Sequence, residues 1–146
     1  MATAVDVAAY VLQNVSPITA MKLQKLVYYS QAWHLVWESR PLFADRIEAW
    51  PNGPVAPVLY DAHRGEFQVK SGSVGGSPGV LDDGERESID AVLKFYAGMT
   101  AYELSDLTHS EQPWLAARKG YAHGERCNVE ITQAAMAEIY ESLVGA

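Results

Sequence analysis

The chain has 146 residues, of which 49% are hydrophobic, and carries a formal net charge of −7. Its length predicts one domain with a core large enough to fold without a disulfide or a metal. The negative charge argues against broad binding to nucleic-acid phosphates, which requires a basic surface. Residues 61–146 contain fourteen acidic and seven basic side chains, whereas 1–60 contains four of each. This uneven charge favours solubility, with a basic partner protein as the alternative.

Three features of the chain bear on its compartment. Cys127 is the only cysteine, which excludes an internal disulfide framework and is typical of a reducing compartment. The N-terminus has no basic region and carries Asp6, so it is unlike a secretory signal. The most apolar stretch, 26–37, is interrupted by polar residues and is shorter than the roughly 20 residues of a membrane span. These features predict a soluble, cytoplasmic protein.

The N-terminal residues are predicted to form two helices. Apolar residues at helical spacing indicate the first helix over 4–13, and a break follows it. Thr19 is expected to cap the second helix, over 20–38. This second helix is apolar nearly all round, which is typical of a helix packed on several sides. It is therefore predicted to lie at the centre of the core.

The segment after the central helix contains a turn with a clear local pattern. Residues 47–50 are predicted to form a short strand, and the prolines and Gly53 of 50–54 favour a tight turn. Pro54 suits the first position of a short helix, predicted over 54–64. The side chains expected to face inward from this helix are those of Val55, Val58 and Leu59.

The remaining elements alternate between loops and short helices. Residues 66–70 alternate like a strand, and the Gly/Ser-rich stretch 71–79 is expected to be a flexible surface loop. The helices predicted beyond it start with capping boxes at Asp82–Glu85 and Thr100–Glu103, with Pro113-Trp114, and with Thr132 before 133–144. The chain is thus predicted to be a mainly α, compact single domain over 1–146. It should contain five to seven helices around the central apolar helix, with at most a small β element.

The residues that could bind a metal or act in catalysis form no recognisable pattern. The four histidines are His34, His63, His109 and His123, and no two of them have a metal-ligand spacing on one helix. The chain has no Gly-x-Ser-x-Gly motif and no phosphate-binding glycine loop. A metal-dependent enzyme built on His109, Glu111 and His123 is the alternative. No catalytic residue, metal site or cofactor is predicted.

Aromatic residues are numerous, with four tryptophans and eight tyrosines. Most of them are expected to pack in the core, and the alternative is that some form an interface, where Trp and Tyr are enriched. Tyr28 and Tyr29 are adjacent on the central helix and cannot share one face. One of them is therefore expected to reach a groove or the surface.

Three motifs together resemble a known family. The first is the run 21–35, with its Lys-Leu-Gln-Lys-Leu sequence; the second is Ile47–Trp50 with Gly53–Val55; the third is Thr108–Trp114. In this order and spacing they resemble the Panacea domain of the SocA-like antitoxins, also labelled phage-associated GepA-like proteins, over about residues 5–140. The motif positions expected to be structural are Leu23, Leu26, Trp33, His109, Glu111, Pro113 and Trp114.

The resemblance implies an antitoxin of a bacterial or prophage toxin–antitoxin pair. Such a protein neutralises a toxin, encoded by a neighbouring gene, through direct protein–protein binding. The alternative is an adaptor that delivers the bound toxin to a AAA+ protease. A transcriptional regulator is less favoured, because the chain is acidic and has no evident recognition helix. The residues predicted to border the toxin-binding surface are Lys25, Tyr28, Gln31, Trp50, Asn52, Gly53 and Pro54.

Overall fold

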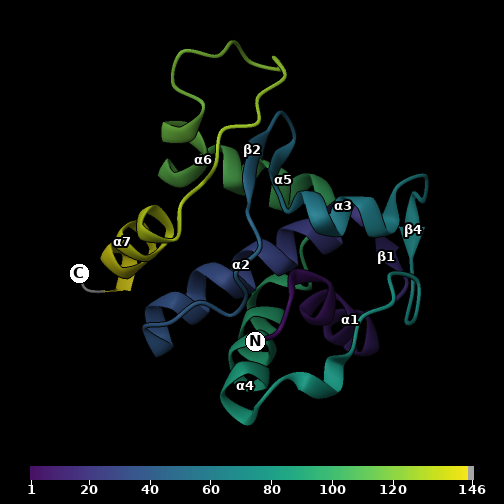
Figure 1. The fold of residues 1–146 in the computed structure, drawn as a ribbon. Helices are drawn as coiled ribbons and strands as arrows, with labels where there is room; N and C mark the ends of the chain where they lie inside the picture. The colour runs from purple at the N-terminus through teal and green to yellow at the C-terminus, as the bar shows by residue number, and fades with distance from the viewer. Residues whose placement is uncertain (145–146) are drawn as a thin grey trace.

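Helix α2, Ala20–Glu38, is the central element of the fold. The computed structural model describes residues 1–144, and in it α2 runs through the middle of the molecule with other helices around it (Figure 1). The hydroxyl of Thr19 accepts a hydrogen bond from the backbone N–H of Lys22, which satisfies a free donor at the start of the helix. The predicted helix and its predicted cap are both confirmed.

Helices α1 (Ala4–Asn14) and α4 (Asp83–Tyr96) both pack against α2. Each of them begins with a capping box, formed by Thr3 with Asp6 and by Asp82 with Glu85. The box of α4 is the predicted one. The box of α1 uses the same spacing with aspartate as the acid.

Helices α5 (Ala101–His109), α6 (Gln112–Ala117) and α7 (Gln133–Val144) complete the helical shell. Thr100 and Glu103 form the predicted capping box of α5. Helix α7 packs against both α2 and α6. With the short helix α3 (Pro57–His63), the described part of the chain contains seven α-helices, so the prediction of a mainly α fold is confirmed.

Two short antiparallel strand pairs accompany the helices. Strands β2 (Glu48–Trp50) and β3 (Gly53–Val55) form a hairpin, with Trp50 opposite Gly53. Residues 129–131 run along the other edge of β2, where the N–H of Ala49 donates to the carbonyl of Val129 at 2.9 Å. The second pair joins β1 (Ile18–Thr19) to β4 (Gln68–Val69). The strand predicted at 47–50 is confirmed, and the alternating segment 66–70 contributes β4.

The short helix after the hairpin differs from its prediction. Gly53–Val55 is strand β3, and helix α3 covers only Pro57–His63. The backbone of Ala56 is bonded on both sides by a buried side chain of α2, described below, which keeps this residue extended before the helix begins. Val58 was expected to face inward but is exposed, because α3 packs through its Leu59 face alone.

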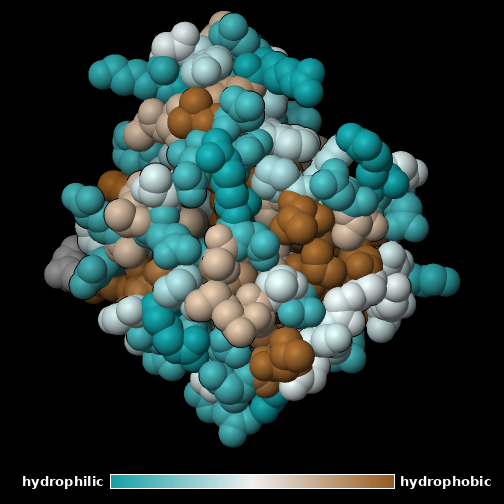
Figure 2. All heavy atoms as spheres, viewed as in Figure 1, coloured by the Kyte–Doolittle hydropathy of each residue, from teal (hydrophilic) through white to brown (hydrophobic). Residues whose placement is uncertain are grey.

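The Gly/Ser-rich segment 71–79 contains turns and part of a 3₁₀ turn at Pro78–Val80. It lies against α1: the N–H of Ser77 donates to the Asp6 carboxylate at 2.8 Å, and Val74 is buried. On the face drawn in Figure 2, hydrophilic residues predominate and hydrophobic ones gather beside α3. Within residues 1–144, no helix is both long enough and apolar enough to cross a membrane.

Candidate functional site

Gln31, in the middle of α2, is fully buried and holds the loop that follows the helix. Its side-chain oxygen accepts a hydrogen bond from the N–H of Leu42, and its side-chain nitrogen donates to the carbonyl of Phe43, each at 2.7 Å. The sequence predicts Gln31 at the border of a contact surface, but the structure places its side chain in the core. The reason is that this loop is buried and its backbone groups need hydrogen-bond partners.

Gln24, two turns earlier on α2, holds the start of α3 in the same way. Its side-chain oxygen accepts from the N–H of Ala56 at 3.0 Å, and its nitrogen donates to the carbonyl of Ala56 at 3.3 Å. The same nitrogen lies 3.0 Å from Nε2 of His63. Burial lowers the pKa of His63, which favours the neutral ring that this contact requires. A side chain of α2 thus fixes the backbone where the hairpin leads into α3.

Lys25 is buried beneath the hairpin, with 1% of its surface exposed. Its ammonium nitrogen donates to the carbonyl of Pro54 at 3.3 Å. Burial lowers the pKa of Lys25 to about 7, because the charged form loses its hydration. The sequence predicts that the Lys25 side chain borders a contact surface, but the structure buries it.

Gly53 lies close against the side chain of Lys25. Its φ is +122°, in the region that favours glycine. A Cβ added there would lie 2.5 Å from Cε of Lys25 and 2.9 Å from Oγ1 of Thr108. Gly53 and Pro54 are both buried, so these two residues connect the hairpin to the core and leave its tip to face solvent.

Tyr28 and Tyr29 belong to a buried hydrogen-bonded group around Glu111. The hydroxyls of Tyr29 and Tyr140 each donate to Oε1 of Glu111 at 2.7 Å, and the hydroxyls of Tyr28 and Tyr140 lie 2.9 Å apart. Burial raises the pKa of the Glu111 carboxyl, and the two phenol donors partly offset this. Neither Tyr28 nor Tyr29 reaches the surface, contrary to expectation, because α4 and α7 cover both sides of α2.

The Thr108–Trp114 motif supports the hairpin from its other side. The indole N–H of Trp114 donates to the carbonyl of Trp50 at 2.8 Å. The ring of His109 stacks on Trp114 with 4.0 Å between centroids, and Arg118 lies over the same indole while donating to the carbonyl of Ala49. Burial lowers the pKa of His109. Of the other motif positions, Leu23 and Leu26 lie in the core and Trp33 packs at its edge.

The residues considered for a metal-dependent enzyme are His109, Glu111 and His123, and their side chains do not form one group of ligands. The rings of His109 and His123 lie edge to face with 6.3 Å between centroids, but the Glu111 carboxylate is bonded to Tyr29 and Tyr140. In the part of the chain that the structure describes, no three His, Cys, Asp or Glu residues are grouped as metal ligands would be. Nε2 of His109 is buried there without a hydrogen-bond partner.

The accessible part of the predicted surface is the tip of the hairpin, Trp50, Pro51 and Asn52, which we call the hairpin face. Asn52 is exposed, and the Trp50 ring packs edge to face on Tyr60 at 5.0 Å. Two cavities flank this tip. One, of about 700 Å³, extends past Tyr60 and Arg64 to the 126–128 loop. The other, of about 440 Å³, lies between the hairpin and the start of α2 and has Lys25 in its wall.

Sequence reasoning missed Tyr60 and Arg64, which frame the hairpin face. The guanidinium of Arg64 lies 5.5 Å from the centroid of the Tyr60 ring. Tyr60 lies on α3 and Arg64 follows the last residue of that helix, and their spacing of four residues is the signal that could have identified them. Trp37 belongs to the helix predicted to be packed on several sides, but it is 45% exposed, because it lies in the last turn of α2, at the edge of the packed helices.

The fold and the site define a class of mainly α domain in which a central helix holds a hairpin through buried amide and ammonium groups. The family model for "Antitoxin SocA-like, Panacea domain" matches residues 23–115, and the chain belongs to this family. The resemblance seen in the sequence motifs is therefore confirmed. The chain is similar to the antitoxin SocA of Caulobacter vibrioides (strain NA1000 / CB15N), with 33% identity over 110 residues. The matched region covers 67% of this chain and 58% of that relative, and no solved structure shows significant similarity.

Proposed function

We propose that this chain is an antitoxin that neutralises a protein toxin by direct binding, with the hairpin face as part of the contact surface. Membership in the SocA-like family supports the antitoxin role. The observation that carries the choice of surface is the way Gln24 and Lys25 fix the backbone of Ala56 and Pro54 from below. The proposal assigns no catalytic step to the chain.

A fixed hairpin is suited to protein binding for an energetic reason. A surface that is already ordered loses little conformational entropy when a partner docks, so more of the contact energy appears as affinity. The hairpin face also combines residue types that dominate protein interfaces, namely Trp50 with Tyr60 and Arg64 beside it. In this proposal Lys25 positions the hairpin face from within, Tyr28 and Gln31 hold other parts of the fold, and none of the three contacts the toxin.

The partner in this proposal is the product of a neighbouring gene, met in the bacterial cytoplasm. Two modes of neutralisation differ in whether the toxin remains in the cell. Masking leaves the toxin intact in a complex, whereas delivery to a AAA+ protease removes it from the cell. Measuring toxin abundance in cells that survive because of the antitoxin separates the two modes.

The experiment is co-expression of the neighbouring gene product with variants of this chain, scored by growth and by affinity of the purified pair. Asn52→Arg is the main variant, because the Asn52 side chain is exposed and its backbone carbonyl keeps its bond from Ser105. We expect Asn52→Arg and Trp50→Ala each to weaken the complex about tenfold or more and to reduce rescue of growth.

The matched control is Val80→Ala, an exposed apolar residue on the 3₁₀ turn beside α1. It is expected to leave both growth and affinity unchanged. Unchanged affinity in the Asn52→Arg and Trp50→Ala double variant would exclude the hairpin face. Failure of the unmodified chain to bind or neutralise the neighbouring product would reject the proposed function.

A further inference from the structure

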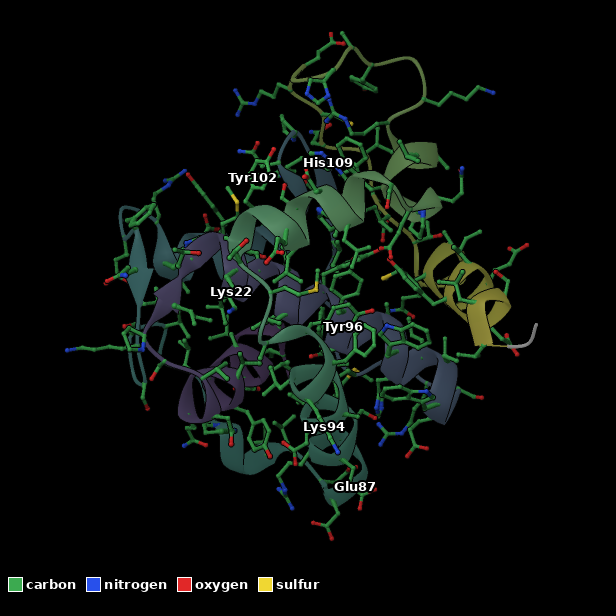
Figure 3. All side chains as sticks on the ribbon, turned by 180° about the vertical axis from the view of Figure 1, so that it is seen from behind. Lys22, Glu87, Lys94, Tyr96, Tyr102 and His109 are labelled. Atoms are coloured by element: carbon green, nitrogen blue, oxygen red, sulfur yellow. The ribbon has the colours of Figure 1, made fainter. Side chains whose placement is uncertain are left out.

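An apolar groove lies between the C-terminal part of α2 and helices α4 and α7, away from the hairpin face. We call it the α2–α4–α7 groove, and its volume is about 330 Å³. Figure 3 shows Tyr96 at the end of α4, between that helix and the neighbouring ends of α2 and α7. The residues that line the groove are Trp33, Trp37, Ala91, Val92, Phe95, Tyr96 and Val144.

The groove displays large apolar side chains that the core does not use. Phe95 is 74% exposed and Trp37 is 45% exposed. The floor beneath them is ordered, because the indole N–H of Trp33 donates to the hydroxyl of Tyr96 at 2.9 Å and Trp33 stacks on Trp37 at 5.6 Å. Covering these apolar side chains with a partner would remove apolar surface from water, which favours binding.

The rim of the groove is mainly acidic. Glu87 is exposed on the same stripe of α4 as Ala91 and Phe95, at spacings of four and eight residues. Glu141 is exposed one turn before Val144 on α7.

The basic groups near these acids leave the rim with a negative excess. Arg40 is paired with both Asp82 and Glu85, and Arg86 is paired with Asp83. Lys94 is exposed on α4, between Glu87 and Tyr96 in Figure 3. Among the described residues beside the groove, Lys94 therefore stands against two rim acids, Glu87 and Glu141, and a partner with positive charge beside its apolar residues fits this arrangement.

The walls of the groove determine the backbone conformation of its occupant. All three walls are helices, whose N–H groups at these C-terminal ends are bonded within each helix, so they offer no strand edge with which an extended occupant could pair. An occupant that buries its backbone here must satisfy its own N–H and C=O groups, as a helix does. We propose that the α2–α4–α7 groove binds a basic amphipathic helix of a partner protein, whose apolar face enters the groove while its Lys and Arg residues lie over the acidic rim. This inference goes beyond toxin binding at the hairpin face and does not depend on it.

The test uses a designed peptide as the probe. It has about 18 residues, longer than the roughly 12–15 at which isolated helices are marginal, with leucines at i, i+3, i+4 and i+7 and flanking lysines. A matched peptide carries glutamate in place of every lysine. The lysine peptide is expected to bind at least about tenfold more tightly than the glutamate peptide at low salt. Equal affinity of the two peptides would overturn the proposal.

Nuclear magnetic resonance of the indole N–H groups locates the peptide on the full chain. The four tryptophans divide between the two surfaces, with Trp33 and Trp37 in the groove and Trp50 and Trp114 at the hairpin. Binding in the groove should shift the signals of Trp33 and Trp37 and leave the other pair in place. Shifts confined to Trp50 and Trp114 would overturn the assignment.

Variants of exposed residues complete the test without disturbing the core. Phe95→Ala is expected to weaken peptide binding about tenfold, and Glu87→Gln with Glu141→Gln about threefold. Tyr102→Ala, on α5 and equally exposed at 74%, is the matched control and should change nothing. Loss of binding in the control to the same extent as in Phe95→Ala would overturn the proposal. So would a dimer of the chain that Phe95→Ala dissociates, since the groove would then hold a second copy.

Discussion

The hairpin face and the α2–α4–α7 groove are built on the two halves of one helix by opposite means. In the N-terminal half of α2, the polar side chains of Gln24 and Lys25 point inward and bind the backbone of the hairpin segment. In the C-terminal half, the apolar ring of Trp37 is half exposed and lines a groove. This difference shows that, on a central helix, the type of a residue does not predict whether its side chain is buried or exposed. Polar residues are buried wherever a neighbouring loop needs hydrogen bonds, and apolar ones are exposed where the covering helices end.

The largest expected effect is a loss of stability when a buried polar side chain of α2 is removed. Gln31→Ala leaves the backbone groups of Leu42 and Phe43 buried without their partners. Each such loss costs about 1–3 kcal/mol, so we expect the free energy of unfolding to fall by about 3–5 kcal/mol. Urea denaturation followed by tryptophan fluorescence measures this. Gln13→Ala, on the exposed side of α1, is the control, and an equally small loss in both variants would show that Gln31 does not hold the loop.

Substitution of Gly53 tests how tightly the hairpin is joined to α2. Gly53→Ala combines an unfavourable φ with a Cβ placed against Lys25, and we expect a loss of about 2–4 kcal/mol in the free energy of unfolding. Gly98→Ala is the matched control, because a Cβ there meets no atom of the described residues within 4 Å. A Gly53→Ala variant as stable as Gly98→Ala would mean that the hairpin shifts freely over α2.

The lowered pKa of the buried Lys25 leads us to expect that the stability of the chain depends on pH. Its pKa is lowered from 10.5 to about 7 in the folded chain, so between these values the unfolded chain binds more protons than the folded one. The contribution of Lys25 to the free energy of unfolding should therefore rise as pH increases from about 7 to about 10.5, and it should be lowest and constant below about 7. Lys25→Met should remove this rise and stabilise the chain most at neutral and lower pH.

The measurement for Lys25 is the difference in unfolding free energy between the variant and the unmodified chain, taken at several pH values. The exposed Lys94→Met is the matched control for the removal of a lysine side chain. A flat difference for Lys25→Met would show that its ammonium group is hydrated in the folded chain.

The smallest expected effect on stability is at the groove. Phe95→Ala removes a ring that is 74% exposed, so the free energy of unfolding should change by no more than about 0.5 kcal/mol. The same variant should lose binding of the lysine peptide, which is the reverse of the behaviour expected for Gln31→Ala. A large loss of stability would place Phe95 in the core and remove the contrast between the two halves of α2.

Features set by near neighbours in the chain could be predicted from the sequence. The cap of α2 at Thr19 and the capping boxes at Asp82 and Thr100 depend on contacts three residues apart. The central position of α2 followed from its apolar residues on every side. The hairpin turn followed from the prolines and Gly53. In each case the physical cause lies within a few residues of the pattern that indicates it.

The tertiary structure alone decided which polar side chains of α2 are buried and where its apolar ones are exposed. Gln24 meets Ala56 across 32 residues, and Tyr28 meets Tyr140 across 112. Such contacts exist only once loops and helices distant in the chain come together, so no local pattern encodes them. The family motif at 21–35 identified residues of α2 that stabilise the fold. Their burial depends on the hairpin, α4 and α7, which cover α2 only in the folded chain. The accessible surface is what remains after those long-range hydrogen bonds and packing contacts form, and it reduces the predicted toxin-binding set to Trp50 and Asn52.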